Sequence, residues 1–221
     1  EAEGIYVGYK YYETRYFDAV MGQGNANSAA GATQGSAWNY GDEMLYTFGH
    51  GLSYLDYTQT IKSVTVDRSV NGNITAVVEV KNNSNQDGKF LTQLYVQQPY
   101  TDYDRTNLVE KSAVMFLNSA KVDVAAGKSK EVTITIPTKY LANNAKTYIL
   151  DAGDYYFTAA AGAHEAVNNI LAAQGKTVAD GMDAAGSKAV VSWKLDQLDN
   201  TTFAIANNTT VTNVADDADL N

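Results

Sequence analysis

The feature that most constrains this sequence is an alternation of apolar and other residues, which begins near Thr60 and recurs in short runs. In the clearest run, Ile74, Ala76, Val78 and Val80 occupy every second position. Side chains at this spacing share one face of a β-strand, so the run predicts a strand with one buried face. Similar runs predict strands at 61–66, 90–97, 111–117, 120–124, 130–136, 148–150, 153–160 and 188–195.

Turn signals separate these runs. Residues 81–88 and 126–128 are polar or glycine-containing, and Pro137 ends the run before it. Residues 151–154 are expected to join 148–150 and 153–160 in a hairpin. About seven short strands over roughly 100 residues are typical of a mainly β fold, an immunoglobulin-like or fibronectin type III-like β-sandwich.

Other stretches predict helix, loop and arm. Ile5, Tyr9 and Tyr12 have the spacing of one helical face and predict a short helix within 1–18, which Gly4 and Gly8 would weaken. The stretch from His164 to about residue 174 has the apolar period of a helix inserted before the last strand. The polar stretch 21–42 reads as a loop with Trp38 and Tyr40 anchoring its far end, and 197–221 as an extended acidic arm.

Composition excludes several classes of function. The 221 residues carry a net charge of −9, which disfavours nucleic acid and anionic membranes as partners. No cysteine is present, so disulfides, thiolate metal sites and cysteine nucleophiles are excluded. No apolar run approaches the ~20 residues of a membrane span, and the first residues do not resemble a signal peptide. Localisation stays open, with a bacterial cytoplasm favoured over secretion.

An aromatic and glycine-rich motif stands where the composition changes. Before it the chain is rich in Gly, Ala and Tyr, and after it the strand pattern begins. We interpret it as the junction between the tail of one domain (1–57) and a β-sandwich domain (58–196, with the helical insertion near 164–174), followed by a linker arm (197–221). Its structural residues are Phe48, Gly49, His50, Gly51, Leu52, Ser53 and Tyr54.

This motif and a second one, Glu3-Gly4-Ile5-Tyr6-Val7-Gly8-Tyr9-Lys10-Tyr11-Tyr12, resemble in order and spacing blocks of glycoside hydrolase family 3, the β-glucosidase family. Later blocks fit as well, at 93–96, 110–111 and 152–156, although the family usually has Pro where Thr47 stands. The resemblance implies the end of an α/β sandwich domain followed by a fibronectin type III-like domain. The tail from Val211 to Asn221 resembles the linker of domain-shuffled members, in which the catalytic barrel follows.

The resemblance assigns no catalytic residue to this chain. Retaining glycosidases need two carboxylates, a nucleophile and an acid/base. In the family the nucleophile is an Asp of the barrel, and the acid/base is typically a Glu upstream of the first block. We expect neither here, no cofactor and no metal, and a parent protein that is a retaining β-glucosidase-type enzyme. The expected role is therefore that of a non-catalytic accessory segment which braces the α/β sandwich domain and the barrel.

Individual polar residues have structural interpretations. His50 is interpreted as a turn histidine among aromatic residues, and His164 as a helix-start residue in a polar setting. Glu3 and Glu13 would lie on different helix faces. Asp102 and Asp104, and the acidic residues 216–219, lack the glycine and distal glutamate of a calcium loop. Asn-x-Ser/Thr triplets at Asn73, Asn82, Asn200 and Asn208 matter only in a protein secreted by a eukaryote.

The sequence leaves three roles open, and each predicts a different feature. For the accessory segment, Tyr100 and Tyr103 in the polar loop 99–107 are candidates for the rim of the active site. A carbohydrate-binding module would instead present a planar row of aromatic residues on one sheet. A protein-interaction sandwich would have no domain remnant at 1–57. We also expect 1–57 either to dock tightly on the sandwich or to mediate self-association through exposed apolar surface.

Overall fold

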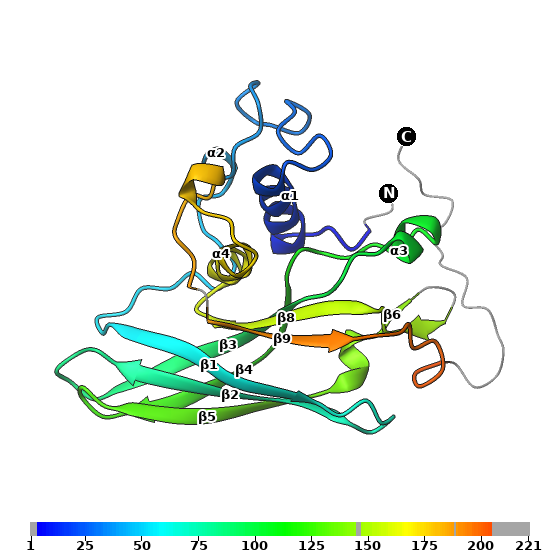
Figure 1. The fold of residues 1–221 in the computed structure, drawn as a ribbon. Coiled ribbons are helices and arrows are strands. Elements are labelled where there is room, and N and C mark those ends of the chain that lie inside the picture. The colour runs from blue at the N-terminus through cyan, green and yellow to red at the C-terminus, as the bar shows by residue number, and fades with distance from the viewer. Residues whose placement is uncertain (1–3, 145–146, 188, 205–221) are drawn as a thin grey trace.

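The computed structural model describes residues 4–144, 147–187 and 189–204. Its long strands form two antiparallel sheets that face each other (Figure 1). The first sheet has the order β1-β2-β5, with β1 Tyr57–Val66, β2 Asn73–Asn82 and β5 Ser129–Pro137. The second has the order β4-β3-β8-β9, with β4 Met115–Val124, β3 Gly88–Gln97, β8 Gly153–Ala160 and β9 Val190–Leu195.

The main hydrophobic core lies between these sheets. Ile74, Ala76, Val78 and Val80 of β2 are all fully buried in it, which confirms the alternation read from the sequence. The side chains that alternate with these four are half-buried and lie on the outer face of the first sheet, which no other layer of the described chain covers. The strand is therefore fully buried on one face only.

The second sheet is covered on both faces. Leu94, Tyr95 and Val96 are consecutive residues of β3, and all three are fully buried. Leu94 and Val96 face the first sheet, whereas Tyr95 belongs to a second core under the helices. A strand buried on both faces reads as a continuous apolar run, which explains why β3 lacks the alternation of β2.

Helices form a third layer above the second sheet (Figure 1). α4 (Ala163–Ala173) packs on β8 and β3, and α1 (Tyr9–Met21) packs on α4. α2 (Tyr40–Glu43) closes the far end of the loop that follows α1. Trp38 and Tyr40 are buried in this second core, as expected for the anchor of that loop.

Short elements complete the described chain. α3 (Asp102–Thr106) follows β3, and the 3₁₀ turn η1 (Thr138–Leu141) follows β5. β6 (Asn143–Asn144) pairs with β7 (Tyr148–Ile149), and the 3₁₀ turn η2 (Val178–Asp180) follows α4.

The first helix differs from its prediction. α1 begins at Tyr9 and therefore excludes Ile5, which lies in the irregular stretch before the helix. Gly8 precedes the helix with a φ of +57°, and Gly22 ends it in the left-handed conformation with a φ of +72°. The glycine that was expected to weaken the helix instead supplies its N-terminal boundary.

Two strand predictions are wrong. The stretches 111–117 and 120–124 do not form two strands, because a single strand, β4, begins at Met115 and pairs with β3 up to Val124, with a bulge at Leu117. The segment 148–150 does not form a hairpin with 153–160, because β8 is already paired on both edges, with β3 and β9. β7 pairs with β6 instead. The loop 99–107 also contains the helix α3.

The arm predicted at 197–221 lies mostly outside the described residues. Its described part makes a bridge between Asp199 and Leu150, followed by a turn held by the Asp199 carboxylate. None of the helices in the described ranges has the length and hydropathy required to cross a membrane.

Candidate functional site

The aromatic and glycine motif lies across the corner where β8 leads into α4. The Ala163 amide donates a hydrogen bond of 3.0 Å to the Phe48 carbonyl oxygen, and the Phe48 ring stacks on Tyr9 of α1. Gly49 has a φ of +91°, and a Cβ at this position would lie 2.7 Å from the Cα of Gly162. A side chain is therefore excluded at Gly49 both by conformation and by space. Phe48 and Gly49 join the N-terminal segment to the sandwich.

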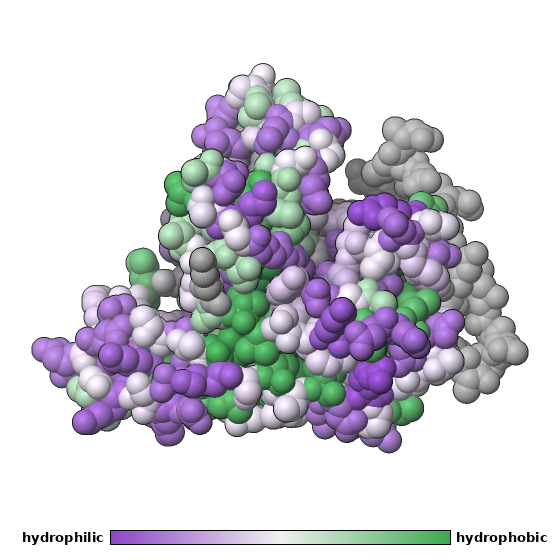
Figure 2. Space-filling view, in the orientation of Figure 1, coloured by the Kyte–Doolittle hydropathy of each residue, from purple (hydrophilic) through white to green (hydrophobic). Residues whose placement is uncertain are grey.

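The residues around this docked part face solvent. The exposed fractions are 84% for Leu45, 66% for Tyr46, 96% for Leu52 and 108% for Tyr54. His50 is also exposed, and its ring lies 5.0 Å from that of Tyr46. Figure 2 shows a hydrophobic group projecting from the left side of the molecule, where Figure 1 places the segment leading into β1. We call Leu45, Tyr46, Leu52 and Tyr54 the exposed apolar segment.

A histidine cluster holds the helical layer together. His164 Nδ1 lies 2.8 Å from Glu13 Oε2, and His164 Nε2 lies 2.8 Å from Asp183 Oδ2. Tyr40 stacks on the imidazole with ring centroids 4.0 Å apart, and its hydroxyl donates a hydrogen bond of 2.5 Å to Glu13 Oε1. Glu13 is fully buried although it is a carboxylate. The cluster therefore joins α1, α2, α4 and the segment after η2.

The electrostatics of the histidine cluster favour a charged imidazole. Burial alone would lower the pKa of His164, but the hydrogen bonds and charges of Asp183 and Glu13 raise it to about 9. Burial would raise the pKa of Asp183, but His164, Asn168 and Tyr16 lower it to about 2. His164 was expected to be a helix-start residue in a polar setting, and the structure gives it two ionic partners, of which Glu13 is buried and Asp183 is exposed.

A cavity of about 340 Å³ opens beside this cluster. Asp180 and Asp183 line it with Tyr16, Trp38 and Tyr40. The pKa of Asp180 is lowered by hydrogen bonds from Thr177, and that of Asp183 is lowered as well. Both carboxylates are therefore ionised at neutral pH. Glycoside hydrolysis by a carboxyl pair requires one protonated member, which these two do not provide.

A lysine cluster stabilises the opposite end of the sandwich. Lys111 Nζ lies 2.8 Å from Asp104 Oδ2 and 2.5 Å from Asp151 Oδ2, and it donates a hydrogen bond to the Pro99 carbonyl oxygen. The side chains of Lys111, Asp104 and Asp151 are 2%, 0% and 0% exposed. Burial raises the pKa of Asp151, and the hydrogen bond and charge of Lys111 oppose that effect. The cluster fixes α3 and the following loop on β7.

The predicted rim residues lie on this loop. Tyr100 is half exposed, and the Arg105 guanidinium lies 5.1 Å from its ring centroid. Tyr103 turns inward and packs with Val109 and Ile149. Of the two, Tyr100 is the residue with the exposed side chain. A role for either at an active site stays a prediction.

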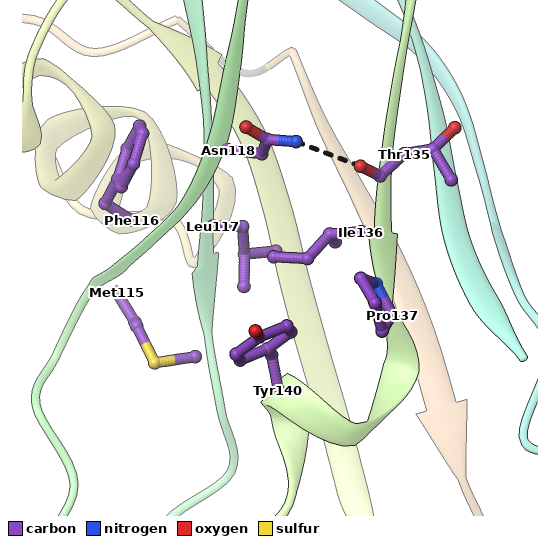
Figure 3. Close-up of a pocket in the computed structure, with 8 residues that line it drawn as sticks. All are labelled: Met115, Phe116, Leu117, Asn118, Thr135, Ile136, Pro137 and Tyr140. Carbon is purple, nitrogen blue, oxygen red and sulfur yellow. Dashed lines mark hydrogen bonds between the residues drawn. The ribbon is translucent and has the colours of Figure 1, made fainter. Parts of the chain in front are cut away.

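A second cavity, of about 490 Å³, lies between the edge strands β4 and β5 (Figure 3). Asn118 Nδ2 donates a hydrogen bond of 2.9 Å to the Thr135 carbonyl oxygen and links the two sheets there. The lining residues are uncharged: Met115, Phe116, Leu117, Asn118, Thr135, Ile136, Pro137 and Tyr140. This groove offers apolar contact but no acid or base for chemistry.

Other polar motifs carry no site in the described part of the chain. No group of three or more His, Cys, Asp or Glu residues there is arranged to hold a metal ion. Asp104 belongs to the lysine cluster, and 216–219 lie outside the described residues, as do Glu3 and Asn208. Asn82 is buried and donates hydrogen bonds to backbone carbonyls, so it is not accessible to glycosylation, whereas Asn73 is exposed.

Comparison with known proteins gives the family. No family model matches the chain. The chain is 31% identical over 157 residues to thermostable beta-glucosidase B of Acetivibrio thermocellus, which covers 69% of this chain and 17% of that protein. It is 26% identical over 156 residues to an exo-alpha-(1->6)-L-arabinopyranosidase of Bifidobacterium longum, covering 69% and 16%. The crystal structure of Bifidobacterium adolescentis GH3 beta-glucosidase matches 94% of this chain and 23% of its own, with 21% identity and a TM-score of 0.53.

The chain is a relative of the family 3 β-glucosidases. The resemblance read from the two sequence motifs is thereby confirmed. The chain spans about a sixth of the length of the curated relatives it matches. What it shares with family 3 is thus one segment, and the match to the solved structure concerns the fold of that segment.

Sequence reasoning missed the two charged clusters of this family 3 segment. Lys111 was assigned to a strand, and Glu13 was considered only together with Glu3. The available signal was a charged residue placed inside or beside apolar runs, as Lys111 and Asp151 are. Their partners could not be read from spacing, because His164 and Glu13 are 151 positions apart.

Proposed function

We propose that the chain is a non-catalytic accessory segment of a family 3 glycoside hydrolase acting in carbohydrate metabolism. In this role it braces the remaining domains of the enzyme, an α/β sandwich and a barrel, without supplying a catalytic carboxylate. The similarity to relatives over about a sixth of their length supports a role as one part of a larger assembly.

The exposed apolar segment carries this proposal. Leu52 and Tyr54 are almost fully exposed to solvent. Phe48 and Gly49, which precede them in the chain, are nevertheless fixed on the sandwich. A large apolar side chain held in water by an anchored backbone loses about 1.5–3 kcal/mol of stabilisation that burial would give. Several such residues beside a fixed motif are typical of a surface that binds another protein domain.

The chemistry of the charged groups supports a non-catalytic role. In the lysine cluster both carboxylates are sealed from solvent, so no substrate reaches them. In the cavity beside the histidine cluster, both carboxylates have lowered pKa values. Neither arrangement matches an accessible pair with one protonated and one ionised member.

The domain division is part of the proposal. We assign 1–57 to the tail of an α/β sandwich domain, 58–196 to a fibronectin type III-like domain and 197–221 to a linker. Seven main strands in a three-plus-four arrangement support the second assignment, and the contact of Phe48 with the β8–α4 corner supports a junction at this motif. The helix α4 is then an insertion that lies between the last two strands of the second sheet.

Two measurements test the proposal. The purified chain should show no turnover of an aryl β-glucoside, and measurable turnover would overturn the non-catalytic role. In sedimentation velocity the chain should associate at high concentration, and the double variant Leu52→Ser with Tyr54→Ser should stay monomeric. Val70→Ser, at a 62% exposed site in the turn between β1 and β2, is the matched control. Equal sedimentation of all three would overturn the docking surface.

The carbohydrate-binding alternative is less well supported. It requires aromatic rings in a row on one sheet, whereas the most exposed tyrosines lie outside the strands: Tyr46, Tyr54, Tyr100 and Tyr140. Retention of the chain on insoluble polysaccharide, with release by soluble sugar, would favour that alternative over the accessory role.

A further inference from the structure

The two ring nitrogens of His164 both face carboxylate oxygens. Nδ1 lies 2.8 Å from Glu13, and Nε2 lies 2.8 Å from Asp183. A neutral imidazole has one N–H donor and one lone pair, whereas the imidazolium ion has two donors. A neutral ring would therefore turn a lone pair toward one of the two carboxylates. With both carboxyl groups ionised, two good hydrogen bonds at these distances require the imidazolium.

The groups around the imidazole come from every element that packs on it. α1 contributes Glu13 and Tyr16, α2 contributes Tyr40, and the segment after η2 contributes Asp183. Burial raises the pKa of both tyrosine hydroxyls, and their carboxylate neighbours raise it further. The tyrosines therefore stay neutral well into the alkaline range. Within this group, His164 is the residue whose charge changes between neutral and alkaline pH.

Few other polar contacts fasten α1 to the helix beneath it. Glu13 on α1 is bound by His164, and the Tyr16 hydroxyl donates a hydrogen bond to Asn168 of α4. Loss of the imidazolium proton would leave Glu13 buried beside a neutral ring without a positive partner. A buried carboxylate that loses its counter-charge is strongly destabilising, so the contact between α1 and α4 would weaken.

We propose that His164 is a pH-sensitive fastener: as an imidazolium it holds α1 and α2 on α4, and loss of one proton in alkaline solution releases the N-terminal segment from the sandwich. This inference goes beyond the accessory role and does not depend on it. It assigns to the junction a conformational switch whose moving part is α1, with its attached loop and α2.

The direction of the pH effect follows from linkage. The pKa of His164 is raised in the folded protein from its ordinary value of 6.5 to about 9. The stabilisation is therefore complete below pH 6.5 and is lost as the pH rises to about 9. Such a change in pKa corresponds to docking that is on the order of 100-fold tighter with the proton than without it.

Hydrogen exchange of the full chain tests the switch. In His50→Gln, which keeps His164 as its single histidine, the amides of α1 should lose on the order of 100-fold in protection between pH 7 and pH 10 after correction for intrinsic exchange. Amides of β2 should keep their protection, which excludes global unfolding. In His164→Gln the α1 amides should already be weakly protected at pH 7 and should change little up to pH 10.

Asp183→Asn provides a second variant if His164→Gln does not fold, because it leaves the buried residues intact. It should shift the loss of α1 protection to lower pH. If α1 protection in His50→Gln is the same at pH 7 and pH 10, or if His164→Gln protects α1 as well as His50→Gln does at pH 7, the proposal is wrong. Neither result bears on hydrolysis or self-association, so the accessory role is tested separately.

Discussion

Two regions of the molecule each hold two carboxylates close together around one cation, but the cation differs. In the lysine cluster Lys111 lies between Asp104 and Asp151, and in the histidine cluster His164 lies between Glu13 and Asp183. Each places one positive group between two carboxylates. The lysine cluster is sealed from solvent, whereas the Asp183 side chain at the rim of the histidine cluster is 46% exposed.

The difference lies in what each cation joins. Lys111 connects segments of the sandwich itself, α3 and the residues after β7, and a lysine ammonium keeps its charge through the ordinary pH range. His164 connects α1 to α4, and an imidazole loses its charge within reach of that range. A permanent cation therefore stabilises the sandwich, and a titratable cation stabilises the helical layer.

Lys111→Met should have the largest effect. It leaves two buried carboxylates without a cation, which should lower the free energy of unfolding by about 4 kcal/mol. Urea denaturation at pH 7 measures the change. The matched control is Lys194→Met, whose side chain is 66% exposed and which should change stability by less than about 0.5 kcal/mol. A loss below about 1 kcal/mol for Lys111→Met would contradict the role of the lysine cluster.

His164→Gln should cost about 2 kcal/mol at pH 6, because Gln cannot donate to both carboxylates. The difference in the free energy of unfolding between the two proteins should shrink as the pH rises toward 10. The wild-type imidazole then loses its proton, and with it the stabilisation that Gln cannot provide. Urea denaturation at several pH values measures the difference between the two proteins. His50→Gln should leave stability unchanged at each pH. If the difference in the free energy of unfolding grew with pH, the charged imidazole would be destabilising, and the role assigned to His164 would be wrong.

Tyr40→Phe should cost about 1.5 kcal/mol. The variant keeps the ring that stacks on His164 but removes the hydroxyl that donates to the buried Glu13 carboxylate. Thermal unfolding at pH 6 reports the loss. Tyr46→Phe, at a 66% exposed position, is the matched control and should be neutral. Equal effects of the two substitutions would show that the hydrogen bond from Tyr40 to Glu13 does not stabilise the protein.

Asp183→Asn should have the smallest effect, below about 1 kcal/mol at pH 6, because half of this carboxylate is exposed and screened by solvent. Urea denaturation against Asp196→Asn, an 85% exposed control, measures it. A loss as large as that of Lys111→Met would mean that the two clusters are equally sealed, and the contrast between them would fail.

Periodicity was enough to predict the sandwich and not enough to predict either cluster. The period of two in β2 and the apolar face of α4 are local properties, so the sequence specifies both elements. The stretch from Lys111 to Val114 was predicted as part of a strand because it leads into an apolar run. Ala113 and Val114 are buried, but Val114 lies before β4 and packs in the second core beneath the helical layer. An apolar run alone does not distinguish burial in a strand from burial in a loop.

The missing information was long-range. Asp151 is 40 positions from Lys111, and Glu13 is 151 positions from His164, so no spacing rule joins them. Gly8 was recognised as a helix breaker but not as the residue that starts α1, because its role depends on a positive φ that the sequence does not display. The interpretation of the aromatic and glycine motif as a domain junction stays a prediction, and within that motif Phe48 and Gly49 contact the β8–α4 corner.

The most direct test of this account is the protonation state of His164 itself. Nitrogen-15 NMR of the imidazole in His50→Gln, recorded at pH 7.5, distinguishes a ring with two N–H groups from a neutral ring with one. Two protonated nitrogens are expected at this pH, with deprotonation near pH 9. A ring with one unprotonated nitrogen at pH 7.5 would contradict the fastener at the junction and with it the contrast between the two clusters.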